Sequence, residues 1–158
     1  MREVDRIADQ LRQTFEGDAT GEAWFGPALR PLLRGVSAAA AAHRPLPARH
    51  TTWELVLHLT ANIDFVLARL DGHELELSPS ADWPAVPEGV DPTAAWNEAL
   101  AALDSRYGAL MMKVRALDDE QLGVPVVGRR YSVYVMLHGI IDHNVYHAGQ
   151  VALLRGAA

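Results

Sequence analysis

The 158-residue chain contains no cysteine. This absence excludes disulfide frameworks, thiolate metal sites and cysteine nucleophiles. Long apolar runs are also missing, since none approaches the roughly 20 residues that span a bilayer as a helix. The N-terminal sequence MREVDRIADQ mixes charged and apolar residues and does not resemble a secretory signal peptide. We therefore expect a cytoplasmic protein with no membrane partner.

Basic residues are also fewer than acidic ones. The chain has 14 Lys and Arg against 20 Asp and Glu, which gives a formal net charge of −6. Proteins that bind nucleic acids usually present a basic face that neutralises phosphates. Here the basic residues are scattered, and Arg129–Arg130 is their only adjacent pair. The composition thus predicts no direct contact with nucleic acid.

Aromatic residues make up only 7% of the chain, and four of them are tryptophans. Trp24, Trp53 and Trp96 are expected to pack in or against the core. Trp83 differs because it stands alone in a proline-containing segment, which suggests the wall of a pocket.

Apolar residues recur at helical intervals in four stretches of the sequence, and this pattern predicts four principal helices. They run from Val4 to Phe15, from Thr51 to Leu70, from Pro92 to about Leu117, and from Val133 to Arg155. Thr51 and Glu54 have the spacing of a capping box at the start of the second helix. Asp91 followed by Pro92 is a typical start for the third.

The connections add detail to this bundle. Short helices are expected between residues 29 and 36 and between residues 38 and 42. Residues 73 to about 90 form a connection that is long for a compact bundle, so it is either functional or crosses over the bundle. No repeat or second domain is evident. We predict an all-α protein of one domain, residues 1–158: a four-helix bundle with short extra helices and a long connection between its second and third helices.

Two of the seven histidines, His143 and His147, lie four residues apart in the last predicted helix. Side chains at this spacing project in the same direction. A third, His58, lies on the apolar face of the second helix. Three imidazoles from two helices would leave a coordination position of a bound ion open, as catalytic zinc sites do. Spacing therefore identifies His58, His143 and His147 as candidate metal ligands, although histidines on apolar faces also serve as packing residues.

Neighbouring polar residues have roles that remain open at this stage. Glu54 lies one turn before His58, but the capping box accounts for it without a metal. Asn62, Gln150, Asp142 or a backbone carbonyl could orient a ligand ring through its second nitrogen.

The HExxH motif of zinc proteases is absent, because His143 is followed by Asn144 and no general base is supplied. A metalloprotease mechanism of that type is excluded.

Three segments together resemble one known family, the DinB/YfiT-like metalloenzymes: WFGPAL from Trp24, WELVLH ending at His58, and DHNVYHAGQVALLR ending at Arg155. The resemblance implies a four-helix bundle with a divalent ion, most often zinc or nickel, held by three histidines. Carried over by motif, these are His58, His143 and His147. One position departs from the pattern, since relatives often have histidine where this chain has Phe25.

The resemblance also implies candidate functions. The leading one is an S-transferase that uses a low-molecular-weight thiol of the bacillithiol or mycothiol type as co-substrate and acts on small electrophiles through the metal site. One alternative is a metal-dependent hydrolase that uses a metal-bound water. Another is a non-catalytic, metal-stabilised binding module. A small-molecule substrate is expected for either enzyme, and a homodimer is plausible because cyclic dimers are the commonest assembly.

Overall fold

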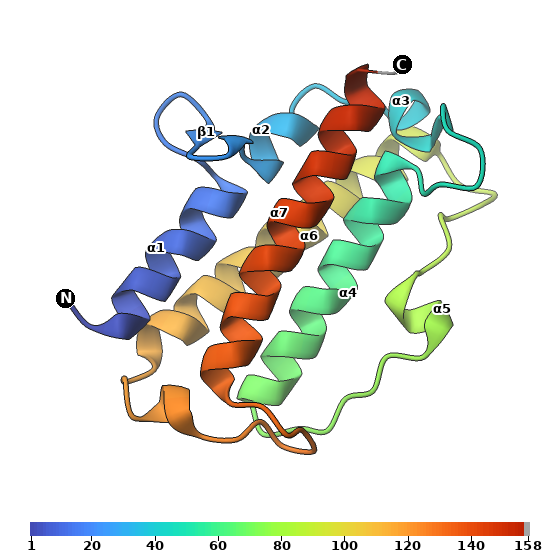
Figure 1. Cartoon of the computed structure of the whole chain (residues 1–158). Helices are drawn as coiled ribbons and strands as arrows, with labels where there is room; N and C mark the ends of the chain where they lie inside the picture. The colour runs from blue at the N-terminus through green and yellow to red at the C-terminus, as the bar shows by residue number, and fades with distance from the viewer. Residues whose placement is uncertain (157–158) are drawn as a thin grey trace.

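The computed structural model describes residues 1–156. Its architecture is a bundle of long helices (Figure 1), which confirms the all-α prediction. These helices are α1 (Glu3–Phe15), α4 (Thr52–Leu70), α6 (Pro92–Ala116) and α7 (Val133–Gly156).

Shorter elements lie in the connections between these helices. The helical ones are α2 (Leu29–Leu33), α3 (Ala38–Ala42), α5 (Pro79–Asp82) and a 3-10 turn at Gln121–Gly123. Strands β1 (Glu22–Ala23) and β2 (Gly26–Pro27) pair antiparallel in a small hairpin.

Local sequence signals set the starts of two principal helices. The Thr51 hydroxyl accepts the Glu54 backbone N–H at 3.2 Å, and the Glu54 carboxylate accepts the Thr51 N–H at 2.7 Å. At the start of α6, the Asp91 carboxylate accepts the Thr93 N–H at 2.9 Å, and Pro92 occupies the first turn, where no N–H is required. Both predicted caps are confirmed.

The long connection crosses over the bundle. In Figure 1, α4 and α6 run in the same direction, and the chain between them passes along the outside of α4 and includes α5. Helix α4 packs against both α6 and α7, while α1 covers α6 and α7 from the other side. The crossover therefore places the segment around α5 beside the contact between α4 and α7.

A continuous cluster of buried apolar side chains fills the bundle. Trp53 and Trp96 belong to it, with ring centroids 5.3 Å apart. The prediction for Trp24 is wrong, since this side chain is 97% exposed. Trp24 lies at the tip between β1 and β2, whose strands pair only with each other and so hold the tip away from the bundle.

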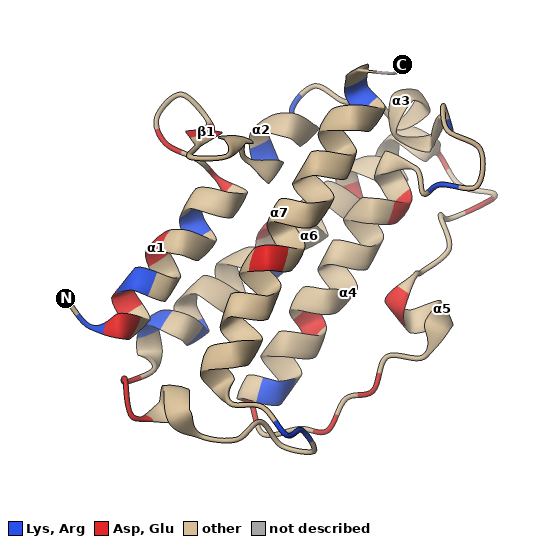
Figure 2. Cartoon of the chain, in the orientation of Figure 1, with Lys and Arg blue, Asp and Glu red and all other residues tan. Residues whose placement is uncertain are grey.

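Charged residues are distributed over the outer surfaces, and α7 carries very few (Figure 2). Among the described residues, no helix combines the length and the apolarity needed to cross a membrane. Within this apolar interior, α4 and α7 also bury polar side chains, among them His58, Arg69, Asn144 and His147. Polar groups at such positions require partners.

Candidate metal centre and adjoining hollow

The structure brings together the three histidines that the spacing singled out. The Nε2 atom of His143 lies 3.0 Å from Nε2 of His58 and 3.1 Å from Nε2 of His147. Within residues 1–156, this is the only group of potential ligand side chains whose donor atoms converge closely enough to hold one metal ion. His58 and His147 are buried and His143 is partly buried.

The helices explain why the three rings meet. His143 and His147 stand one turn apart on α7, so their rings overlie each other with centroids 4.4 Å apart. Because α4 packs against α7, the ring of His58 reaches the same point, 4.9 Å from each of the other two rings. The packing of α4 against α7 thus adds a third ring to the pair that the four-residue spacing brings together.

Hydrogen bonds on the outer nitrogens fix the orientation of two rings. His58 Nδ1–H donates to the Asp82 backbone carbonyl at 2.6 Å, and His147 Nδ1–H donates to Gln150 Oε1 at 2.8 Å. We assign these tautomers because both oxygens can only accept in this arrangement. The Nε2 lone pairs of both rings then point inward, towards His143. Such outward bonding is the usual support of histidine ligands.

The three Nε2 atoms hold at most one proton, that of His143, so at least two of them present inward lone pairs. Neighbouring acceptors repel each other, and a cation between them removes the repulsion. The donor set contains nitrogen only, which suits zinc, nickel, copper or iron. The residues present therefore fit a divalent transition-metal ion.

Burial keeps the imidazoles of His143 and His147 neutral, which is the state that binds metals. Burial, together with the nearby rings of His147 and His58, lowers the pKa of His143 to about 4. Burial also lowers the pKa of His147, and its bond to Gln150 opposes that effect. The buried Nδ1 atom of His143 has no hydrogen-bond partner among the described residues.

A stack of aromatic rings covers His58 on one side. Trp83 lies parallel to His58 with ring centroids 3.8 Å apart, and His50 lies on the other face of Trp83 at 3.5 Å. Trp83 belongs to the long connection, just after α5. The crossover therefore holds the candidate ligand His58 through both the Asp82 carbonyl and the Trp83 ring.

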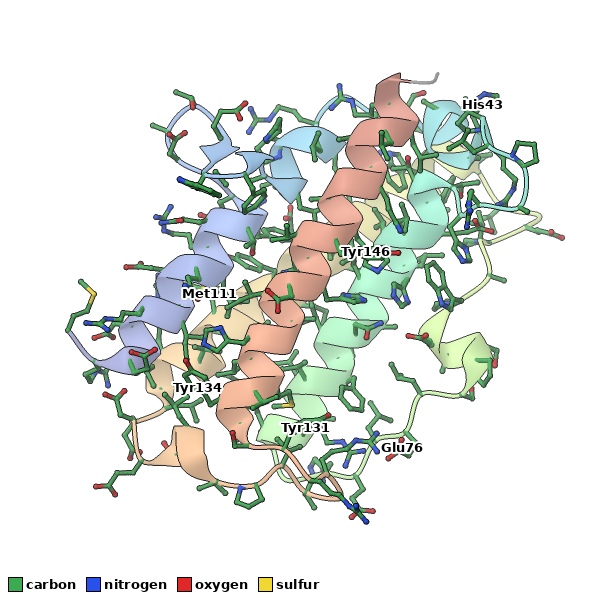
Figure 3. The ribbon with its side chains drawn as sticks, viewed as in Figure 1. His43, Glu76, Met111, Tyr131, Tyr134 and Tyr146 are labelled. Carbon is green, nitrogen blue, oxygen red and sulfur yellow. The ribbon has the colours of Figure 1, made fainter. Side chains whose placement is uncertain are left out.

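A hollow of about 590 Å³ opens beside this stack. His147, Trp83, His50 and Tyr146 are among its lining residues. Figure 3 shows Tyr146 on α7, on the side towards α4. The prediction that Trp83 forms a pocket wall is confirmed. A candidate ligand ring thus faces a space large enough for a small molecule.

The other polar candidates have separate outcomes. Asn62 Nδ2 lies 3.2 Å from Nδ1 of His58, the second nitrogen of that ring, and donates to the Asp82 carboxylate at 2.9 Å. Asp142 is exposed and makes no hydrogen bond to the three rings, because its side chain points out of the bundle. Glu54 bonds to Thr51 and to Arg44 at 2.8 Å, which leaves its role as that of a cap.

Asp82 was not identified from the sequence. It contributes through its backbone carbonyl, which every residue has, and it lies 24 positions from His58. The only local signal was its neighbour Trp83, an aromatic residue in a long loop.

A family model described as the DinB superfamily matches residues 24–151. The match covers most of the chain and includes all three histidines. No curated protein and no solved structure matches the chain.

Proposed function

The chain belongs to the DinB superfamily, and from this membership and the converging imidazoles we propose that it is a metal-dependent enzyme. His58, His143 and His147 are the proposed ligands of a divalent ion, with zinc or nickel the leading candidates. The proposed reaction is the transfer of a low-molecular-weight thiol to a small electrophile.

One observation carries the proposal: three nitrogen donors converge at the edge of a hollow of about 590 Å³. Structural zinc sites use four protein ligands, whereas catalytic sites keep a position for substrate. Among the described residues no fourth His, Asp or Glu joins the three histidines. A purely structural role would leave both the missing ligand and the adjoining space without explanation.

A divalent ion held here would supply a Lewis acid that favours the thiolate form of a thiol at neutral pH. The protein's own part is to keep His143 and His147 neutral by burial and to orient His58 and His147 through the Asp82 carbonyl and Gln150. In the transfer, a bond forms between the sulfur and the electrophilic carbon. The bond from that carbon to its leaving group breaks, with the electron pair going to the leaving group and the thiol proton to solvent.

Hydrolysis is the alternative reaction, and it would call for a group that removes a proton from water. No Asp or Glu among the described residues lines the hollow. The closest acidic candidate from the sequence, Glu54, is engaged by Thr51 and Arg44. His50, which also lines the hollow, is the residue that could remove a proton from water. A thiol loses its proton far more readily than water does, so thiol transfer depends less on such a base.

The test is a conjugation assay on protein made without a polyhistidine tag and loaded with one equivalent of zinc or nickel. Monochlorobimane and an epoxide serve as electrophiles, with bacillithiol, mycothiol, cysteine and glutathione as thiols. We expect conjugation well above the rate without protein for at least one thiol, and none above it for the His143→Leu/His147→Leu variant.

Conjugation at the uncatalysed rate with every thiol, in protein that retains its metal, would contradict the thiol-transferase proposal. Ester hydrolysis that needs no thiol and follows the same two histidines would establish the alternative reaction.

A further inference from the structure

The histidine cluster is bordered by a second hollow, of about 280 Å³, that differs in charge from the first. His143, Phe65, Tyr131 and Met136 are among its lining residues, and no charged side chain contributes. Figure 3 shows Tyr131 near the start of α7, towards the opposite end of that helix from the larger hollow. The cluster therefore lies between an uncharged space and one that contains Arg49 and His50.

Arg49 is the only Arg or Lys in the lining of the larger hollow, and within the described chain no Asp or Glu lines it. Its guanidinium has no hydrogen-bond or ion-pair partner in residues 1–156, whereas the nearby Arg44 is bonded to Glu54 at 2.8 Å. Arg155 also lines a hollow without a carboxylate partner, but its guanidinium is engaged by the carbonyls of Pro31 and Leu32, whereas no described residue engages that of Arg49. Positive charge of this kind attracts anions.

The segment that carries Arg49 is held in a fixed and strained conformation. Ala48 has a φ of 58°, the only positive value at a non-glycine residue in the described chain. Such backbone strain is frequent at sites that clamp ligands. The Arg44 guanidinium donates to the Arg49 carbonyl and also bonds to Glu54, so the loop is tied to the first turn of α4. The backbone of Arg49 is thus positioned before any ligand arrives.

Apart from Gln150, the rest of the lining is apolar or aromatic. His50 is fixed against Trp83, two ring spacings from His58. Tyr146 and Leu153 are largely exposed hydrophobic side chains of α7 that border the same space. A ligand that fits must offer an anionic group to Arg49 and an apolar body to Trp83 and Tyr146.

We propose that the larger hollow binds a small organic carboxylate, with Arg49 as the residue that binds its carboxylate. Guanidinium groups suit this role because they present a planar pair of donors to the two oxygens of a carboxylate. The inference rests on the proposed function, which it deepens by naming the chemical class of the ligand that lies beside the histidine cluster.

Matched acids and alcohols test the inference without any reaction. The probes are phenylacetate, 3-phenylpropanoate and 4-phenylbutanoate, each paired with the alcohol of the same length and titrated by calorimetry into zinc-loaded and metal-free protein. We expect the best-fitting acid to bind about tenfold more tightly than its alcohol, as a charge-assisted bond at an exposed arginine allows. In Arg49→Gln that preference should fall to about twofold or less, with the affinity for the alcohol unchanged.

Arg115→Gln, which removes an exposed arginine outside both hollows, is the matched control and should leave both affinities unaltered. The inference is overturned if the acid preference survives in Arg49→Gln, if it is lost on metal removal alone, or if no acid binds better than its alcohol. The conjugation assay is independent of these probes. If the protein shows the Arg49-dependent preference but no conjugation, the carboxylate site stands and the thiol-transferase proposal is contradicted. If it shows conjugation but no such preference, the thiol-transferase proposal stands and the carboxylate site is contradicted.

Discussion

Helix α4 buries two nitrogen-rich side chains, Arg69 and His58, and their surroundings differ. Arg69 donates to the carbonyl oxygens of Val127 and Leu75 at 2.5 and 2.8 Å and to the Glu76 carboxylate at 2.7 Å. His58 donates to the Asp82 carbonyl through Nδ1, and its Nε2 atom lies 3.0 Å from Nε2 of His143 and not beside an oxygen.

The difference separates a structural cluster from one prepared for a ligand. At Arg69, oxygen atoms of the protein already compensate the charge and tie α4 to the loops on either side. At His58, three Nε2 atoms lie within hydrogen-bond distance of one another with no oxygen among them, and a cation from outside the chain could be held by all three. Burial alone therefore does not mark a functional site, whereas burial with converging acceptors does.

The largest expected effect on the free energy of unfolding comes from changing Arg69. Arg69→Met removes the partner of two backbone carbonyls and of Glu76, and we expect it to lower the free energy of unfolding by about 3 kcal/mol. Urea denaturation measures the loss. Arg106→Met, which breaks the half-exposed pair with Asp64, is the control and should cost less than about 1 kcal/mol. Equal losses in the two variants would remove the distinction between the clusters.

Metal binding should stabilise the protein through the other cluster. Zinc at 100 times its dissociation constant is expected to raise the free energy of unfolding by about 2.7 kcal/mol, because it binds the folded state. The increase should vanish in His143→Leu/His147→Leu. Arg69→Met, by contrast, should keep it in full under conditions where that variant is folded. A stabilisation by zinc that persists without the two histidines would place the ion elsewhere.

The metal-free protein should lose stability in mild acid. An unfolded histidine titrates near pH 6.5, while the pKa of folded His143 is about 4. Between these values the unfolded chain binds more protons, so the free energy of unfolding falls as the pH drops from about 6.5 towards 4. We expect a loss on the order of 1–2 kcal/mol from this histidine. His143→Leu should show a smaller loss in the same denaturation series, and an unchanged loss would show that other groups cause it.

The smallest predicted effect concerns the support of a candidate ligand ring. Gln150→Ala removes the acceptor from His147 Nδ1 and is expected to weaken zinc binding about tenfold, at the lower limit for such partners. Competition with a chromophoric chelator measures the change. The control Gln10→Ala alters an exposed residue of α1 and should have no effect. Equal affinity in both variants would mean that packing alone orients the ring.

Much of this arrangement could be predicted from the sequence, for identifiable reasons. The i, i+4 relation of His143 and His147 is local, so helical geometry determines it. The capping box at Thr51 likewise involves neighbours only. The apolar stripe around His58 predicted that the ring is buried. It did not determine the distance of the ring from α7, because that distance depends on how the helices of the bundle pack.

The features that escaped prediction lie in the connections between the helices. The contact of the Asp82 carbonyl with His58 joins a loop to a helix through a backbone atom, for which no residue type is a signal. Trp24 is exposed at the tip of a hairpin of two-residue strands, and Arg49 borders the larger hollow next to Ala48, whose φ is positive. In each case tertiary context outweighed the preference of the residue.

The most direct test of the converging imidazoles is X-ray absorption spectroscopy of tag-free protein loaded with one equivalent of zinc. The predicted spectrum shows three imidazole nitrogens at about 2.0–2.1 Å and one further light ligand, which a small thiol replaces with sulfur. Failure to retain zinc, or a site closed by four protein ligands that a thiol does not alter, would contradict the account.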